Sequence, residues 1–159
     1  MTDYDLKLQQ LQKEFIEINT KRANKWQFTP DQKAIYDFVI KSQRYTTFNI
    51  AGYDIILKVG NEDFGFKHFL LKHYGTGCVG EIKANDILKL GNVIKHNISV
   101  PAKEDKIKFI QTKGDLKYSV VLKPQKDGKL VVSFFSSKEE IKIIEQIEII
   151  ISVEIETKL

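Results

Sequence analysis

The chain has 159 residues, of which 42% are hydrophobic and 29% charged, a composition typical of one soluble domain with a sizeable core. Its single cysteine, Cys78, excludes an intramolecular disulfide and a cysteine-based zinc cluster. The net charge of +4 is unevenly distributed: residues 67–129 hold 13 lysines against 6 acids, a net +7, so the remainder carries −3.

The lysine-rich segment suits a phosphate-bearing partner, because clustered ammonium groups can follow a phosphate backbone without reading its sequence. It can equally be a solvated surface. Only two arginines, Arg22 and Arg44, are present, which argues against bidentate recognition of bases or carboxylates. The acidic N-terminus lacks the apolar core of a signal peptide, and no apolar run is long enough to span a membrane. We therefore expect a cytoplasmic protein, or one delivered into the cytoplasm of a target cell, with no membrane partner.

The pattern of residues 1–44 predicts two helices. Apolar residues recur at spacings of three and four over about residues 3–22: Leu8, Leu11, Phe15 and Ile18. Thr29-Pro30-Asp31-Gln32 then combines a capping threonine, a proline at the first helical position and a capping-box glutamine, so a second helix begins here. It should end near Lys41. We expect Trp26 and Phe28, between the helices, to pack them together in preference to stacking on a ligand.

Residues 45–137 change to β-rich patterning. Two runs at 45–50 and 53–59 flank Ala51-Gly52 and predict a hairpin or a bent strand. Two short helices should follow, one closed by Gly75 and one over about residues 84–95 with Gly91 as a candidate break. Three further strands are predicted over about residues 106–112, 116–123 and 129–136, the last two joined by a loop containing Asp127-Gly128.

The C-terminal residues 138–159 are rich in glutamate and isoleucine. Ser137-Lys138-Glu139-Glu140 resembles a capping box, and residues 147–156 alternate like a strand. Together the elements predict an α+β fold in one domain over residues 1–159. It comprises a helical part over 1–44, an α+β core over 45–137 and the acidic C-terminal segment.

The segment from Asp63 to Gly75 holds two of the three histidines. His68 and His73 are five residues apart, about 140° around a regular helix. Paired zinc-binding histidines on a helix sit four apart, so we expect no metal. His73 lies in the last turn, where the helix dipole favours an imidazolium, which makes it a candidate general acid and His68 a candidate general base. The two roles could also be exchanged. The alternative is that both are ordinary polar groups at a helix–sheet junction.

Other polar features suggest less chemistry. Lys72 lies one turn after His68 and could hold a phosphate there. His96 has a loop-like context and is expected at the surface. The glycines of residues 75–80 follow a helix, whereas a phosphate cradle needs glycines before one, so we expect a C-cap and turn. Cys78 has no activating partner nearby in sequence.

A family resemblance is carried by the strand at 53–59, the His-x4-His helix at 67–75, a further helix and a closing strand, Val131-Val132-Ser133-Phe134-Phe135-Ser136. Over about residues 50–137, this arrangement resembles the phage-associated branch of the barnase–EndoU–colicin–RelE (BECR) nucleases. The resemblance implies N-terminal helices packed on a small antiparallel sheet. Many members are metal-independent, RNA-cleaving toxins, and phage-linked members occur beside head proteins.

The resemblance also implies a site. His68 and His73 match the paired catalytic histidines, and Ser133 matches the hydroxyl residue of the closing strand. The residues expected to contact substrate are Lys67, Lys72, Lys117, Tyr118 and Lys123, with Tyr118 as a base-stacking candidate. Residues 45–159 contain no arginine, so a family arginine's role would pass to lysine.

The implied reaction is attack of an RNA 2′-hydroxyl on the adjacent phosphate, with histidine acid–base catalysis and no cofactor. DNA lacks that hydroxyl and should be spared. RNA is the expected partner, and an immunity or antitoxin protein is a further candidate. The alternative is a catalytically silent nucleic-acid-binding module or a phage accessory protein on the same fold. The oligomeric state stays open.

Overall fold

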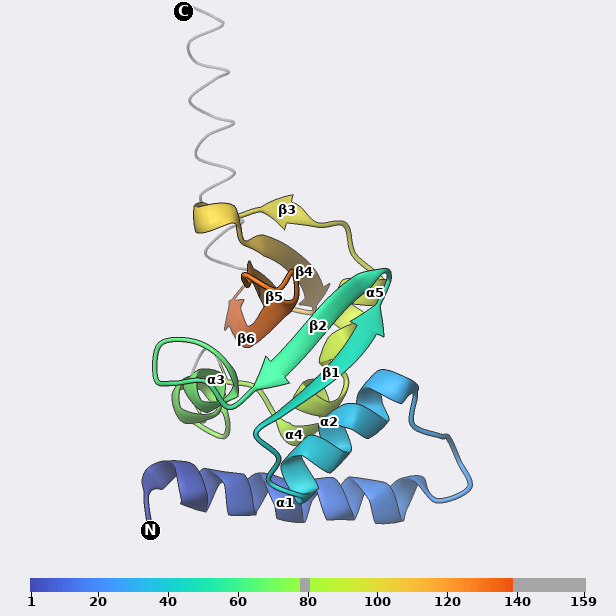
Figure 1. Ribbon diagram of the computed structural model, residues 1–159. Helices are drawn as coiled ribbons and strands as arrows, with labels where there is room; N and C mark the ends of the chain where they lie inside the picture. The colour runs from blue at the N-terminus through green and yellow to red at the C-terminus, as the bar shows by residue number, and fades with distance from the viewer. Residues whose placement is uncertain (78–80, 139–159) are drawn as a thin grey trace, which may run out of the picture.

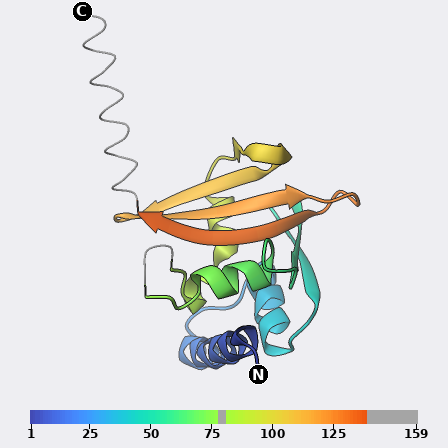
Figure 2. The ribbon, with the colours of Figure 1, turned by 90° about the vertical axis from the view of Figure 1, so that its left-hand side faces the viewer.

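The computed structural model describes residues 1–77 and 81–138, and its α-helices lie on one side of a twisted, six-stranded mixed sheet (Figures 1 and 2). The predicted α+β class is therefore confirmed. The helices are α1 (Asp3–Arg22), α2 (Pro30–Ile40), α3 (Phe66–His73), α4 (Ala84–Leu88) and α5 (Leu90–Lys95), with a 3₁₀ turn at Lys103–Asp105. The strands are β1 (Tyr45–Ile50), β2 (Tyr53–Lys58), β3 (Val100–Pro101), β4 (Ile107–Lys113), β5 (Leu116–Pro124) and β6 (Leu130–Lys138).

The two N-terminal helices begin at capping boxes, which satisfy backbone amides that a helix start leaves unpaired. At α1, the Thr2 hydroxyl accepts a hydrogen bond from the Asp5 amide, and the Asp5 carboxylate accepts one from the Thr2 amide, both at 3.1 Å. At α2, Thr29 and Gln32 form the same reciprocal pair. Both predicted helices are confirmed.

The hairpin predicted around Ala51-Gly52 is also confirmed. Strands β1 and β2 pair antiparallel up to Ile50 and Tyr53, so the turn has two central residues. Ala51 and Gly52 both have positive φ, of 52° and 87°. This left-handed geometry matches the twist of the strands that it joins.

The order of the sheet is β1-β2-β6-β5-β4-β3. An antiparallel sheet was expected, and every pairing among the described strands is antiparallel except that of β2 with β6, which is parallel. This parallel pairing is short, with Ile55 opposite Leu130 and Ile56 opposite Val131. The chain between these two strands is long enough for β6 to return beside β2 in the same direction, because it holds α3, α4 and α5 and then β3, β4 and β5.

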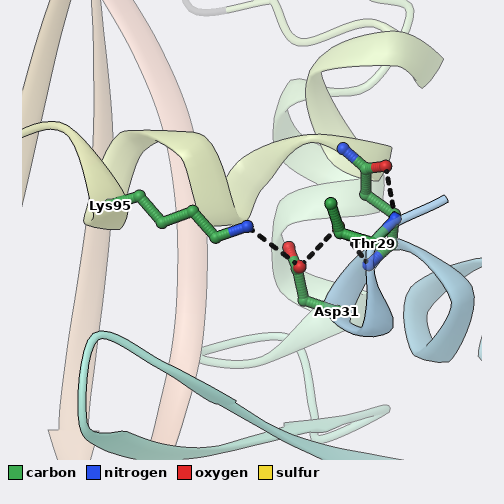
Figure 3. Close-up of polar contacts among 4 residues, drawn as sticks. Thr29, Asp31 and Lys95 are labelled. Atoms are coloured by element: carbon green, nitrogen blue, oxygen red, sulfur yellow. Dashed lines mark hydrogen bonds and ion pairs between the residues drawn. The ribbon is translucent and has the colours of Figure 1, made fainter. Parts of the chain in front are cut away.

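The helix predicted over residues 84–95 is instead two helices, and the break falls at Lys89. Gly91 is buried inside α5, where a side chain has no room: a Cβ atom would lie 2.6 Å from the Ile50 side chain and closer still to Asp31. The Asp31 carboxylate accepts hydrogen bonds from the Thr29 hydroxyl at 2.6 Å and the Lys95 ammonium at 3.2 Å (Figure 3). This contact ties the start of α2 to α5.

The core lies between the helices and the sheet. From the strands it takes alternate residues, which point to the helix side: Phe109, Val120, Leu122, Val132 and Phe134.

β6 continues through Lys138, where a helix start had been expected; the rest of that predicted helix and the strand at 147–156 lie outside the described residues. In the part of the chain that the structure describes, no helix has the length and apolar character needed to cross a membrane.

Candidate functional site

Helix α3, which carries both predicted catalytic histidines, is fixed by aromatic packing. It begins after Gly65, whose φ of 100° few residues other than glycine adopt. Phe66, Phe69 and Leu70 are fully buried. The Phe66 ring meets Phe38 edge-on, with centroids 5.0 Å apart. One face of α3 is therefore held in the core, and the other face remains available.

The C-terminal end of α3 is held by a lysine from α1. The Lys7 ammonium donates hydrogen bonds to the carbonyl oxygens of Leu70, Leu71 and Tyr74 at 3.3, 3.0 and 2.9 Å. These oxygens belong to the end of a helix, which carries unpaired carbonyls and partial negative charge. The backbone just beyond is fixed as well, because the Ile82 amide donates to the His73 carbonyl at 2.7 Å.

The imidazoles of His68 and His73 lie side by side. Their ring centroids are 6.0 Å apart, with the planes at 75° to each other. Their positions diverge by about 140° around the helix. The rings nevertheless come within 6.0 Å of each other. Each histidine is half-buried, so the pair is partly open to solvent.

His68 is oriented by the loop that precedes α3. Its Nδ1 atom lies 2.6 Å from the carbonyl oxygen of Glu62. A carbonyl oxygen only accepts, so Nδ1 carries the hydrogen, and the Nε2 atom of the neutral ring is left as the proton acceptor. The loop is itself ordered by Asn61, whose side-chain oxygen accepts hydrogen bonds from the amides of Asp63 and Phe64 at 2.8 and 3.1 Å.

The same loop brings two lysines to this region. The ammonium groups of Lys106 and Lys123 lie 5.5 and 5.6 Å from the centroid of the Phe64 ring. Of these residues, sequence reasoning predicted only Lys123. It missed Lys106, Phe64 and the Glu62 carbonyl, although Phe64 stood out as an aromatic residue in a polar turn. We call His68, His73, Phe64, Lys106 and Lys123 the α3 site.

The other predicted lysines of α3 differ in position. Lys72 is exposed in the last turn, one turn after His68. The Lys67 ammonium lies 5.8 Å from the centroid of the Tyr4 ring. Lys67 is therefore directed to the α1 side of the helix, so that Lys72 is the better placed of the two to join the α3 site.

The predicted strand residues do not form one cleft, because neighbouring strand residues point to opposite faces of the sheet. Tyr118 lies on the helix side, with its ring 6.1 Å from that of Phe134. Lys117 and Ser133 belong to the opposite face. They are only 6% and 5% exposed, so little of either residue faces solvent. Both lie across the sheet from Tyr118 and share no pocket with it, and their predicted catalytic and phosphate-binding roles stay predictions.

Tyr118 lines a small pocket together with Asp86 and Lys113. Burial raises the pKa of Tyr118, and the nearby carboxylates of Asp86 and Glu81 raise it further. The phenol is therefore neutral at physiological pH.

In residues 1–77 and 81–138, no three histidine, cysteine or acidic side chains are arranged to hold a metal ion.

Comparison with family models, with curated proteins and with solved structures gives no match for this chain. The chemistry of the α3 site therefore rests on its own residues: two adjacent imidazoles, one of them oriented by the preceding loop, and two ammonium groups that contact Phe64 of the same loop.

Proposed function

We propose that the chain is a metal-independent endoribonuclease whose paired histidines move the protons of the reaction. The observation that carries this proposal is the 6.0 Å separation of the His68 and His73 rings, with His68 held through Nδ1 by the Glu62 carbonyl. Two imidazoles so placed can serve the two oxygens of one phosphodiester. A positioned acid and base of this kind contribute roughly 10²–10⁴-fold to a rate.

In the proposed reaction, Nε2 of His68 takes the proton of an RNA 2′-hydroxyl while that oxygen attacks the adjacent phosphorus. His73, in its protonated form, gives a proton to the departing 5′-oxygen. The products are a 2′,3′-cyclic phosphate and a free 5′-hydroxyl. Lys72 and Lys123 supply positive charge near the phosphate, where charge builds up in the transition state.

The test is incubation of the purified chain with total RNA in EDTA, alongside His68→Ala, His73→Ala and His96→Ala. His96 is the matched control, because it is exposed at the end of α5, outside the α3 site. We expect wild type and His96→Ala to cleave RNA, and the other two variants to lose at least about 100-fold in rate.

A modified RNA substrate tests the role of the 2′-hydroxyl directly. A single 2′-deoxy substitution at a mapped cleavage position should abolish cleavage there, because the attacking hydroxyl is gone. Failure of wild type to cleave any RNA would contradict the proposal, as would full activity in both histidine variants.

A second candidate is a non-catalytic RNA-binding module, favoured by two exposed lysines: Lys123 of the α3 site, and Lys72 one turn after His68. Its signature is RNA binding without cleavage that weakens steeply as salt rises, because bound lysines release counterions from the RNA.

A further inference from the structure

The connection between α1 and α2 lies at the far end of α1 from α3 (Figure 1). Its residues line a second pocket. Lys7 contacts α3, whereas Arg22 at the pocket lies fifteen residues further along the helix, about 22 Å at the α-helical rise. The pocket has a volume of about 580 Å³, within the range of small-molecule sites. It is therefore separate from the α3 site.

The pocket combines aromatic rings with cations. It holds the only tryptophan of the chain, Trp26, and one of its two arginines. The Trp26 and Phe28 rings meet edge-on with centroids 5.5 Å apart. The Arg22 guanidinium carbon lies 3.8 Å from the Phe28 centroid, and the Lys89 ammonium lies 4.7 Å from that of Trp26. The cations thus lie against aromatic rings.

The charge of the pocket is positive. Arg22, Lys25 and Lys33 line it, and no acid is among its lining residues as the structure describes them. Lys33 pairs with Asp37 at 3.2 Å, but the lysine side chain is 60% exposed and such pairs are weak. A bound anion could therefore compete for Lys33.

Arg22 is only partly satisfied by the protein. Its Nη1 atom donates to the Trp26 carbonyl at 3.2 Å, whereas its buried Nε atom has no hydrogen-bond partner among the described residues. A buried donor without a partner is costly. The guanidinium therefore keeps hydrogen-bonding capacity that the described residues do not use.

We propose that this pocket binds one nucleotide of single-stranded RNA, with the base against Trp26 and the phosphate at Arg22, Lys25 and Lys33. Stacking on an aromatic ring beside a cationic track is the usual way to hold a single strand without sequence preference. An acidic peptide would match the charge, but it would leave the aromatic surface unused. That the ligand is RNA rests on the proposed function, and the pocket would hold the strand several nucleotides from the α3 site.

Trp26 gives a direct readout, because the fluorescence of the full chain comes from this one indole. We would titrate the His68→Ala chain with AMP, adenosine and inorganic phosphate, then with a short single-stranded RNA. We expect saturable quenching by AMP, at a concentration several-fold lower than for adenosine or phosphate alone. Lys25→Gln and Lys33→Gln should each weaken RNA binding and reduce the log–log salt slope by about 0.7. Lys13→Gln, an exposed α1 lysine outside the pocket, should change neither.

The Trp26→Phe variant lacks the fluorescent indole, so its RNA binding is followed with end-labelled RNA. We expect its affinity for RNA to fall about ten-fold, as for a weakened stacking contact between a base and an aromatic ring. Unchanged Trp26 fluorescence with saturating AMP and RNA would overturn the inference, even if the chain cleaves RNA. Equal quenching by poly-glutamate would overturn it in favour of an acidic peptide. Nucleotide binding at Trp26 in a chain that never cleaves RNA would support the pocket and contradict only the proposed enzyme.

Discussion

The ammonium nitrogen of Lys7 lies 2.9 Å from the carbonyl oxygen of Tyr74, so a lysine of α1 closes the end of the helix that carries both histidines. It also donates to the carbonyls of Leu70 and Leu71. The position of α1 and the C-terminal end of α3, which carries His73, are therefore linked through one side chain.

Lys7→Met tests the hydrogen bonds of the ammonium group apart from the packing of the side chain. Methionine keeps most of the side-chain length and loses the charge. We expect the free energy of unfolding to fall by about 1.5–3 kcal/mol, the range for hydrogen bonds to charged groups. RNA cleavage should fall further than stability alone explains. Urea unfolding and cleavage assays check this against Lys13→Met, in which an exposed lysine of the same helix is changed. Equal behaviour of the two variants would show that the cap has no effect.

Two lysine–aspartate pairs differ in burial and should differ in energy. The Asp31 side chain is 4% exposed where it pairs with Lys95, whereas Asp37 is 24% exposed where it pairs with Lys33. Lys95→Met leaves a buried carboxylate with the Thr29 hydroxyl alone, and we expect a loss of about 2–4 kcal/mol. Lys33→Met should cost less than about 0.5 kcal/mol. Chemical denaturation of both variants measures the difference, and equal losses would contradict this reading of the buried pair.

Gly91→Ala should destabilise the chain although alanine favours helices, because the added methyl group meets Asp31 and Ile50. We expect a loss of about 1–3 kcal/mol, typical of overpacking. In an Asp31→Ala background the same change should cost less, since part of the crowding has been removed. A double-mutant cycle measures the coupling between positions 91 and 31. If the two losses of stability simply add, the alanine methyl group is not crowded by Asp31.

Alkaline pH should destabilise the chain through Tyr4, which is partly buried, and Tyr74, which is buried. Burial, with Asp5 nearby, raises the pKa of Tyr4 to about 12, and burial near Glu14 raises that of Tyr74. The unfolded state releases these protons near pH 10 while the folded state keeps them, so stability is full below pH 10 and falls toward pH 12.

The measurement is the urea midpoint from pH 9 to pH 12. Tyr74→Phe and Tyr4→Phe should each flatten the decline. The control is Tyr45→Phe, because the Tyr45 side chain is 60% exposed and should leave the decline unchanged. A decline that is the same in all four proteins would point to other groups, such as lysines.

The elements that could be predicted from the sequence are those fixed by neighbours in the chain. Thr29 and Gln32 mark a helix start by their spacing alone, and Ala51-Gly52 marks a two-residue turn. The break at Lys89 was missed because the backbone there is set by packing: Gly91, the apparent breaker, is needed for its small size beside Asp31.

The candidate site was predictable only in part, for the same reason. His68 and His73 belong to one helix, so their proximity is nearly local. The meeting of Phe64 with Lys106 and Lys123 depends on a loop and two strands far apart in the chain, which no local pattern encodes. Strand alternation separates Lys117 from Tyr118, but the face that the helices cover is decided by the whole fold.

β6 lies between β2 and β5 in space, yet it is the last of the described strands to be synthesised. Until residues 130–138 emerge from the ribosome, the hairpin of β1 and β2 and the ladder of β3 to β5 each expose an open edge to other nascent chains. Insertion of β6 joins the two halves, so the described sheet closes only after residues 130–138 have been made.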